Sequence, residues 1–454
     1  MERGGRFLMG CGAGFSGDRV DAAVSVVGAM VRSGEPGALM FETLAERTLA
    51  LGHVARRADA TKGYEPLLAA MVGPVLGECV RAGIPIVGNF GAANPVGAAA
   101  VVRGLARDSG LGELRIAVVV GDDIRDSISL KDLSVWEGDA GLVGGTGEMI
   151  AANVYLGARP IADALLAGAQ VVVTGRVADP ALALGPLVAH FGWGWEDWDR
   201  LAGGTLVGHL LECGSQVTGG YFADPGFKDV ARAWDIGFPI AEVFADGSCV
   251  IGKAEGTGGV VSLRTVKEQI LYEVHDPAAY LTPDVTLDVT EVRLTQEGVD
   301  RVRVEGARGW AAPPSLKATV SFEGDWIGEA EISYAGANAL ARGRLAAEVI
   351  GKRIEVRGLA VTKRLDLIGG LSVFDDDGGS LARHTPELPE VRVRLAVSGA
   401  GREVVEQSVQ EVLALLCCGP AGGGGMRSQV RNRVRTVSYL VPRDMVSPSV
   451  SFEW

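Results

Sequence analysis

The sequence contains no apolar run of the roughly 20 residues that a membrane-spanning helix needs, so no membrane partner is expected. Positive charge is also in deficit, because 43 Lys and Arg residues stand against 56 Asp and Glu residues, which gives a net charge of −13. An acidic surface repels phosphate backbones, and nucleic acid is therefore not an expected partner. The first residues lack the long apolar core of a signal peptide, so a cytoplasmic location is expected.

Cysteine is scarce, whereas glycine is abundant. The six cysteines form no C-x-x-C pair, and no H-E-x-x-H sequence is present. We therefore expect neither a disulfide scaffold nor a metal site. The 65 glycines amount to about twice the usual share, which predicts many tight turns and close approaches between backbone segments.

Strand-like and helix-like segments alternate over residues 1–280. Apolar runs such as Ala38–Phe41 and Ile116–Val120 are typical of buried strands. Segments such as Pro95–Ser109 and Met149–Leu166 carry apolar residues at the three- and four-residue spacing of amphipathic helices. The alternation predicts an α/β domain with a mainly parallel sheet covered by helices.

The pattern changes to α+β over residues 281–454. Period-two alternation predicts short strands at Lys317–Phe322 and Ala330–Tyr334. A helix is expected over Asn338–Ile350 and a strand over Arg353–Thr362. We therefore predict a second domain that begins near residue 281.

Polar residues follow the apolar runs of the first domain. Those that we regard as candidate site residues are Glu42, Asn89, Asn94, Asp122, Asp123, Arg176 and Asp179. Because ligands bind beyond the carboxyl ends of strands in open parallel sheets, one composite small-molecule site is expected there. Asp122, Asp123, Arg176 and Asp179 are expected to converge in one cleft, with Asp122 or Asp179 as a catalytic base. A carboxylate near an arginine stays ionised, so the alternative for Asp179 is a partner that orients other groups. The alternative for Asp122 and Asp123 is a helix cap and a solvated acid.

Gly12-Ala13-Gly14-Phe15-Ser16-Gly17 matches the G-x-G-x-x-G pattern after a strand, and Glu42 ends the next strand. This spacing fits phosphate binding by a dinucleotide or CoA, with the glutamate on a ribose. Asp18 departs from the pattern because its carboxylate would repel a phosphate. A tight turn that lines the substrate is the alternative.

Two further glycine-rich stretches are candidate ligand loops. Gly145 and Thr146 precede an expected helix, where they predict either an anion cradle or a simple helix cap. Gly423, Gly424 and Arg427 follow the last apolar helix, and they indicate either a moving loop or bare backbone beside a ligand.

His209 lies over Glu212 and Cys213 if residues 206–213 form a helix. A base, a carboxylate and a thiol on one helix face fit a proton-transfer or nucleophilic site. The same positions also trace an apolar stripe, so a buried structural histidine is the alternative. Histidine titrates near neutrality, and His209, oriented by Glu212, is therefore the favoured catalytic residue of the three.

Several stretches together resemble the acyclic terpene utilisation (AtuA-like) family. They are residues 10–19, 41–48, 94–95, 121–123, 174–179, 208–220 and 419–425. The resemblance runs from residue 6 to about 445, and it does not include the ferredoxin-like domain that many longer relatives carry after this point. It implies a role in the bacterial breakdown of citronellol- and geraniol-type acids, which are handled as CoA thioesters.

The sequence therefore predicts an intracellular, homo-oligomeric enzyme that acts on an acyl-CoA thioester or a related branched carboxylate. Proton-transfer chemistry of a hydratase, dehydratase, isomerase or lyase is the first hypothesis, since a polarised thioester carbonyl eases α-proton removal. No cofactor is certain; CoA would be the substrate's handle. One alternative is an NAD(P)-dependent oxidoreductase that uses the Gly12–Gly17 loop, and another is a non-catalytic subunit that binds an acyl ligand.

Overall fold

The computed structural model describes residues 5–127, 129–137, 148–369, 372–373 and 388–453. Contacts between residues divide the chain into two compact units. Unit 1 comprises Met1–Gly144, Met149–Ser321 and Thr436–Trp454, and unit 2 comprises Gly145–Glu148 and Phe322–Arg435. The sequence pattern predicts a boundary near residue 281, whereas this division falls after Ser321 and again after Arg435.

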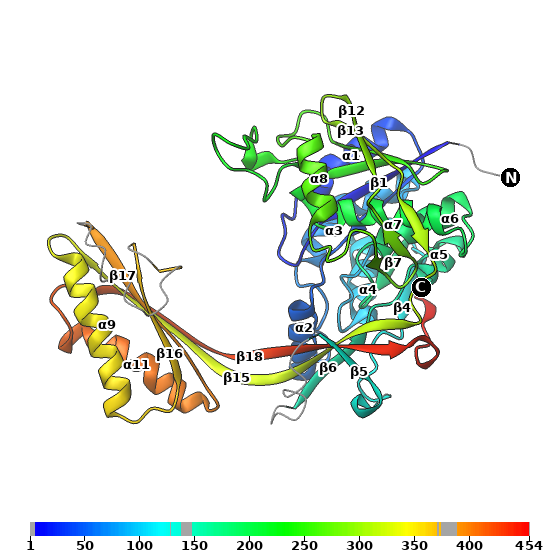
Figure 1. The fold of residues 1–454 in the computed structure, drawn as a ribbon. Helices are drawn as coiled ribbons and strands as arrows, with labels where there is room; N and C mark the ends of the chain where they lie inside the picture. The colour runs from blue at the N-terminus through cyan, green and yellow to red at the C-terminus, as the bar shows by residue number, and fades with distance from the viewer. Residues whose placement is uncertain (1–4, 128, 138–147, 370–371, 374–387, 454) are drawn as a thin grey trace. The chain divides into compact units, whose positions relative to one another are not determined.

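Unit 1 is built on a ten-stranded sheet (Figure 1). Its central strands, in spatial order, are β1 (Arg6–Ala13), β2 (Gly37–Phe41), β3 (Ile86–Gly88), β7 (Val171–Thr174) and β4 (Ile116–Val120), and they pair in parallel. The outer strands pair antiparallel; they are β8 (Pro239–Phe244), β9 (Cys249–Lys253), β13 (Arg301–Glu305) and β12 (Arg293–Gly298) beside β1, and β19 (Ser449–Glu453) beside β4. The predicted α/β class is confirmed, but the sheet is mixed, and parallel pairing is limited to its centre.

Two groups of helices pack against this sheet. The helices of unit 1 are α1 (Ala22–Ser33), α2 (Glu46–Ala58), α3 (Leu68–Ala82), α4 (Pro95–Asp108), α5 (Arg159–Leu166), α6 (Ala181–Phe191), α7 (Trp198–Glu212) and α8 (Leu263–Leu271). Helices α1, α3 and α4 contact one another in turn, and so do α5, α6 and α7. The connections through α1, α3 and α4 advance across the sheet in one direction, whereas α5 leads from β4 back to β7. Because such crossovers are right-handed, the two groups cover opposite faces.

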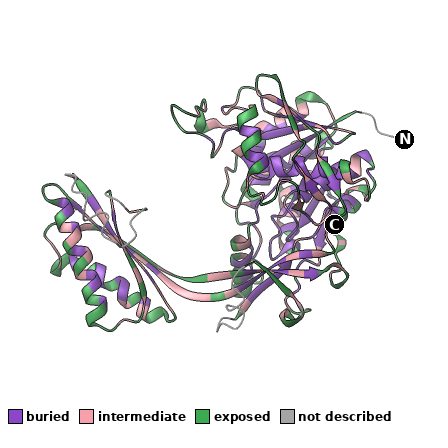
Figure 2. Cartoon of the chain, viewed as in Figure 1, coloured by how far each residue is buried: buried purple, intermediate pink, exposed green. Residues whose placement is uncertain are grey.

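The central strands are therefore buried on both sides, as Figure 2 shows. Their carboxyl ends meet at one edge of the sheet, and the chain reverses its direction across the sheet between β4 and β7. Such a reversal marks the ligand crevice of open α/β sheets. We therefore examine this edge, the carboxyl edge, as the candidate site. A separate small sheet in unit 1 contains β10 (Tyr280–Leu281), β11 (Thr286–Asp288) and β14 (Arg308–Trp310).

Unit 2 has the element order β-α-β-β-α-β. Its elements are β15 (Ser315–Ala335), α9 (Ala339–Val356), β16 (Thr362–Ile368), β17 (Glu390–Gly399), α11 (Arg402–Cys418) and β18 (Gly424–Pro442). The sheet order is β16-β17-β15-β18, and the two helices bury Ile332, Ile350, Val393 and Val412 in one core against it. This is the ferredoxin-like split βαβ arrangement. Strand β6 (Met149–Val154) pairs with β15, and β5 (Ser134–Glu137) pairs with β18.

Two predicted elements are wrong for physical reasons. Residues 149–166 form strand β6 and then α5 instead of one helix, because Pro160 stands in the first turn of α5 and stops the helix from beginning earlier. Residues 353–362 are not a strand: α9 continues to Val356, since Ile354 extends the buried stripe of Ala346 and Ile350. No helix in the described part of the chain is long and apolar enough to cross a membrane.

Candidate active site

Glu42 lies at the end of β2 and is held by the neighbouring strand end. Only 7% of Glu42 is exposed. Its Oε1 accepts hydrogen bonds from the Leu44 backbone N–H at 2.7 Å and from Asn89 Nδ2 at 2.9 Å. Asn89 in turn accepts the Thr43 backbone N–H at 2.8 Å. The carboxyl group is thus fixed in a dry environment.

The environment of Glu42 disfavours its charge. Burial raises the pKa of Glu42 to about 8, and the nearby carboxylate of Asp179 adds to the rise, although Arg176 and the hydrogen bonds oppose it. A carboxyl group with this pKa holds its proton at neutral pH. Glu42 is therefore an acid at pH 7.

Arg176 follows β7 and is 1% exposed. Its Nε donates to the Val177 carbonyl at 2.7 Å, and its other nitrogens donate to the carbonyls of Leu44 and Val177 and to Asp179 Oδ1. The guanidinium carbon lies 4.4 Å from the centre of the Tyr155 ring. These contacts engage all three nitrogens of the guanidinium group within the protein, so Arg176 positions Asp179.

Asp179 is the accessible carboxylate of this cluster. Its side chain is 35% exposed, while that of its partner Arg176 is 1% exposed. Burial raises the pKa of Asp179, and the ion pair with Arg176 opposes this rise. The charge of Asp179 also raises the pKa values of Glu42, Glu212 and Tyr280, although burial is the largest cause for each. The charge of Asp179 thus affects the protonation of three other groups of the site.

Asp122 joins the cluster, whereas Asp123 does not. Asp122 is 5% exposed, and its Oδ2 accepts the Arg176 backbone N–H at 2.8 Å and Asn153 Nδ2 at 2.9 Å. Burial raises the pKa of Asp122 to about 6. The exposed Asp123 instead accepts the backbone N–H of Arg125 at 3.2 Å. Adjacent side chains point apart here, and the structure brings Asp122, Arg176 and Asp179 together.

Sequence reasoning missed several polar residues at this edge. Tyr155 donates a hydrogen bond to Glu46 Oε1, and Lys317 Nζ lies 3.4 Å from the same oxygen. Asn153 Oδ1 lies 3.0 Å from Nε2 of the buried His53. Glu46 belongs to a stretch that carries the family resemblance, and that signal was available. Nothing in the sequence pairs Lys317 with a residue 271 positions away.

His209 is enclosed, and both of its ring nitrogens are engaged. The residue is 1% exposed. Nε2 lies 3.2 Å from the Ile270 carbonyl, and Nδ1 lies 2.9 Å from Glu212 Oε1. A carbonyl only accepts, so Nε2 carries a proton, and Nδ1 shares another proton with Glu212. His209 therefore has no free nitrogen for a substrate.

Glu212, unlike His209, has a side-chain atom without a partner among the described residues. Burial raises the pKa of Glu212 to about 7, against the opposing effect of its hydrogen bond with His209. Its Oε2 is buried and has no hydrogen-bond partner. A buried carboxyl oxygen without a hydrogen bond costs free energy, unless a donor from another molecule pairs with it. The next residue, Cys213, is half-buried, and burial raises the pKa of its thiol, so a thiolate is disfavoured at neutral pH.

The Gly12–Gly17 loop is occupied by the protein itself. The Gly14 N–H donates to Asp18 Oδ2 at 2.8 Å, and a Cβ on Gly14 would lie 2.3 Å from the Gly214 backbone nitrogen. A Cβ on Gly12 would lie 2.6 Å from the Phe41 ring. The following helix, α1, begins only at Ala22. These glycines serve close packing, and Asp18 takes an amide that a phosphate would need.

The other residues of the loop have separate positions. Ala13 is buried and its carbonyl accepts the Glu42 N–H at 3.1 Å, whereas Phe15 is 56% exposed and Ser16 is half-buried. Because Glu42 is bound by Leu44 and Asn89, it is not placed as a free ribose acceptor. The loop and Glu42 therefore do not fit a dinucleotide.

The remaining predicted residues either make other contacts in unit 1 or belong to unit 2. Asn94 caps α4 by accepting the Gly97 N–H at 3.1 Å. Gly424 begins β18 in unit 2, a Cβ on Gly423 would lie 2.9 Å from Ile332, and Arg427 is exposed on β18. Gly145 and Thr146 lie outside the described residues. Among the described residues, no group of three or more His, Cys, Asp or Glu side chains is arranged to hold a metal ion.

A cavity of about 420 Å³ lies at the opposite edge of the sheet. Phe7, Gly37, Ile84 and Gln170, which begin or precede the parallel strands, contribute to its lining. The lining contains no carboxylate. The titratable side chains of this lining are His190 and Cys79, and burial raises the pKa of the Cys79 thiol to about 12. We take the carboxyl edge as the candidate site because several carboxyl groups lie around Arg176 there.

Comparison with known proteins gives one family and one distant likeness. The family model described as acyclic terpene utilisation family protein AtuA matches residues 7–452. No curated protein matches the chain. A solved structure, the de novo designed protein Foldit4, is 16% identical and covers 24% of this chain and 97% of its own, with a TM-score of 0.16. That score is too low to support an inference.

Proposed function

The chain belongs to the acyclic terpene utilisation (AtuA) family, and from this premise we propose that it is an enzyme that transfers protons on a CoA thioester of a branched, terpene-derived acid. Family membership gives the metabolic role, acyclic terpene utilisation. The reaction class is inferred from the carboxyl edge of unit 1, where two neighbouring carboxyl groups differ in their preferred state.

One observation supports this proposal most strongly. Asp179 is partly exposed and paired with the buried Arg176, whereas Glu42 is buried with a pKa of about 8. Two carboxyl groups, one ion-paired with an arginine and one held in its protonated form by burial, are the pairing that acid–base catalysis requires. Asp179 is therefore the proposed base and Glu42 the proposed proton store.

The proposed step conserves protons. The Asp179 carboxylate takes a proton from a carbon that the thioester carbonyl acidifies, and the electron pair of the broken C–H bond delocalises onto the carbonyl oxygen. The proton of Glu42 is then delivered to a different carbon of the delocalised anion, which shifts the double bond. Asp179 returns its proton to Glu42, and the pair regains its starting state.

Glu212 has a secondary place in this scheme. Its Oε2 is buried without a hydrogen-bond partner among the described residues, and His209 holds its other oxygen at 2.9 Å. His209 thus acts as a positioning residue, and the base is Asp179. A nicotinamide-dependent oxidoreductase is not favoured, because Asp18 binds the Gly14 amide of the loop that a dinucleotide would use.

The test is proton exchange in D2O. The wild-type protein is incubated with the CoA thioester of geranic acid, and deuterium in the recovered acyl chain is measured by mass spectrometry. We expect incorporation by the wild type and a loss of about a hundredfold in Asp179→Asn. Asp235→Asn is the matched control, since Asp235 pairs with Arg232 at the same i,i+3 spacing on the surface; it should exchange like the wild type.

The outcomes separate the hypotheses. Binding at 100 times Kd stabilises a fold by about 2.7 kcal/mol, which a melting experiment detects. Stabilisation by the thioester without any deuterium incorporation would contradict the proposed enzyme and favour a ligand-binding subunit. Unchanged exchange in Asp179→Asn would remove Asp179 from the role of base.

A further inference from the structure

Among the described residues, strand β18 has a partner on one of its two sides along only part of its length in unit 2. Strand β15 lies on one side of β18, and β5 pairs only with its C-terminal part, at Ser438, Tyr439 and Leu440. Within the described part of the chain, no strand pairs with the other side of residues 426–433. An open edge presents a row of backbone N–H and C=O groups that can pair with another polypeptide strand.

Three arginines mark this edge. Arg427, Arg431 and Arg433 are exposed, and their odd-numbered spacing places them on one face of β18. This face is the helix-free face of the sheet, because Gln429 donates to Glu329 Oε2 at 2.6 Å there, while Val430 packs against the core under the helices. The edge is therefore both open and basic.

These arginines differ from the other arginines of the same sheet face. Arg392 lies 3.2 Å from Glu331, Arg394 lies 3.4 Å from Glu329, and Arg364 lies 2.8 Å from Asp366. No described residue forms a hydrogen bond or an ion pair with the side chains of the three edge arginines. Carboxylates on the sheet face thus neutralise the inner arginines, whereas the three edge arginines keep their positive charges unpaired among the described residues.

The charge pattern selects among partners. Pairing of β18 with the same strand of a second copy would place odd-numbered positions opposite one another, and arginine opposite arginine is repulsive. By the alternation of the strands, residues 325–335, 362–368, 390–399 and 425–435, which the structure describes, place no aromatic side chain on the helix-free face, so a nucleic acid lacks its usual stacking platform there. A strand with carboxylates at alternate positions would pair each arginine with an opposite charge.

We propose that residues 426–433 of β18 dock an extended acidic segment of a partner protein, which adds as a strand to the sheet of unit 2. Backbone hydrogen bonds to the open edge hold the segment, and its alternate Asp or Glu side chains lie against Arg427, Arg431 and Arg433. This inference is independent of the proposed catalytic site, because no residue of that site takes part.

The experiment uses the full chain and a dye-labelled peptide of alternating valine and glutamate. Fluorescence anisotropy should show saturable binding that weakens with salt, whereas a valine–lysine peptide should not bind. Reversal of the three edge arginines to glutamate should weaken binding by about tenfold or more. The matched control reverses Arg344, Lys352 and Arg402, which lie on α9 and α11, and it should bind like the wild type.

A second peptide tests the strand pairing itself. N-methylation of alternate backbone amides removes the donors that a strand needs, so it should abolish binding. Equal binding by the methylated peptide, equal loss in the control variant, or no binding of the acidic peptide would overturn the proposal. In the last case the arginines only protect the edge against aggregation. Competition by a uridine oligonucleotide would overturn it in favour of nucleic acid.

Discussion

Glu42 in unit 1 and Glu411 in unit 2 have the same exposed fraction, 7%, yet their pKa values are shifted in opposite directions. Burial and Asp179 raise the pKa of Glu42 to about 8. Burial also acts to raise the pKa of Glu411, but hydrogen bonds from Arg357 and Arg353 outweigh it, and the pKa falls below its ordinary value. Those arginine nitrogens lie 2.6 and 3.1 Å from the Glu411 oxygens.

The comparison shows that burial of a carboxyl group does not by itself indicate a site. Glu411 has two cations for one carboxylate, and the result is a structural ion cluster. Glu42 and Asp179 share one buried cation, Arg176, and Lys317 acts on Asp179 as a smaller cause. The two carboxyl groups are therefore not fully neutralised in a site from which water is largely excluded. Mismatched buried charge costs stability and is typical of functional sites.

We expect the largest loss of stability on removal of the Arg176 guanidinium. Arg176→Met should lower the free energy of unfolding by about 3–5 kcal/mol, because it leaves buried carboxyl groups and carbonyls without their donor. Arg392→Met, at a half-exposed pair of unit 2, should cost no more than about 1 kcal/mol. Urea unfolding measures both. Equal losses would mean that the two regions do not differ in the way we describe.

A second contrast concerns two glycine-rich loops. A Cβ on Gly14 meets the backbone of Gly214 at 2.3 Å, whereas a Cβ on Gly424 meets nothing within 4 Å. Gly14→Ala should therefore cost about 1–3 kcal/mol, since backbone atoms have to move apart. Gly424→Ala should leave the melting temperature nearly unchanged. A well-folded Gly14→Ala protein with unaltered stability would show that the packing role of Gly14 is overstated.

The two glutamates should also respond oppositely to pH. A raised folded pKa gives stability that is present below the ordinary value of 4.5 and is lost as pH rises through about 8. Glu42→Gln should therefore gain about 3–4 kcal/mol relative to wild type between pH 5 and pH 8.

A lowered pKa reverses the sign for Glu411. Its stabilising effect is present above the ordinary value and is lost as pH falls through the folded value. Glu411→Gln should lose stability relative to wild type at pH 7, and the gap should close in acid. Parallel pH profiles for the two variants would contradict the comparison.

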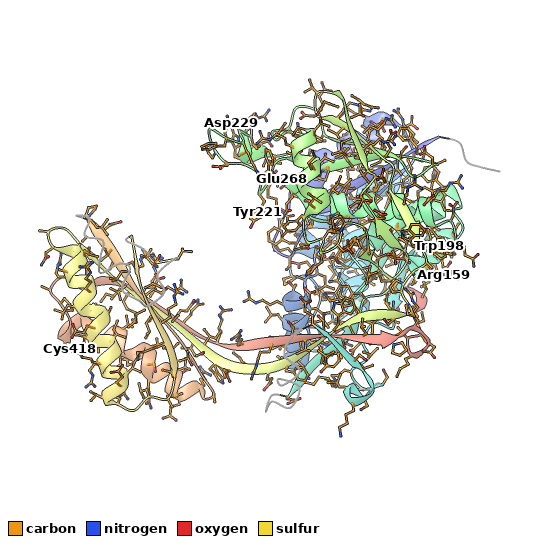
Figure 3. All side chains as sticks on the ribbon, in the orientation of Figure 1. Arg159, Trp198, Tyr221, Asp229, Glu268 and Cys418 are labelled. Carbon is orange, nitrogen blue, oxygen red and sulfur yellow. The ribbon has the colours of Figure 1, made fainter. Side chains whose placement is uncertain are left out.

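The smallest expected effect concerns cysteine reactivity. Cys418 is exposed at the end of α11 (Figure 3), whereas Cys213 is half-buried and burial raises the pKa of its thiol. Iodoacetamide should label Cys418 well before Cys213, and peptide mass spectrometry resolves the order. Faster labelling of Cys213, with protection by the acyl thioester, would instead place a reactive thiol in the site.

Much of the carboxyl edge was predictable from the sequence. Glu42, Asp122, Arg176 and Asp179 each follow an apolar run, and the ends of neighbouring parallel strands share one edge of a sheet. That geometry explains why the structure brings these residues together. It does not predict which side chain points inward, and only the structure distinguishes Asp122 from Asp123.

The remaining features depend on contacts that no local pattern encodes. Lys317 reaches Glu46 through the long strand β15, which the sequence pattern divides into two short strands. The helical spacing around His209 was visible, but the Ile270 carbonyl that engages its second nitrogen comes from another helix, 61 positions away. The extent of unit 2 was also hidden, because β15 and β18 contribute residues to both units.

The central claim is that Glu42 holds a proton at neutral pH while the equally buried Glu411 does not. A matched surface reference is Glu268 of α8, which is visible at the surface in Figure 3 and pairs with Lys228. Carboxyl ¹³C chemical shifts of glutamate-labelled protein, assigned with the three Glu→Gln variants, follow each group against pH.

Our account predicts that the carboxyl resonance of Glu42 titrates near pH 8 and that of Glu411 below the ordinary glutamate range. Titration of both Glu42 and Glu411 near the ordinary glutamate value of about 4.3 would contradict the account.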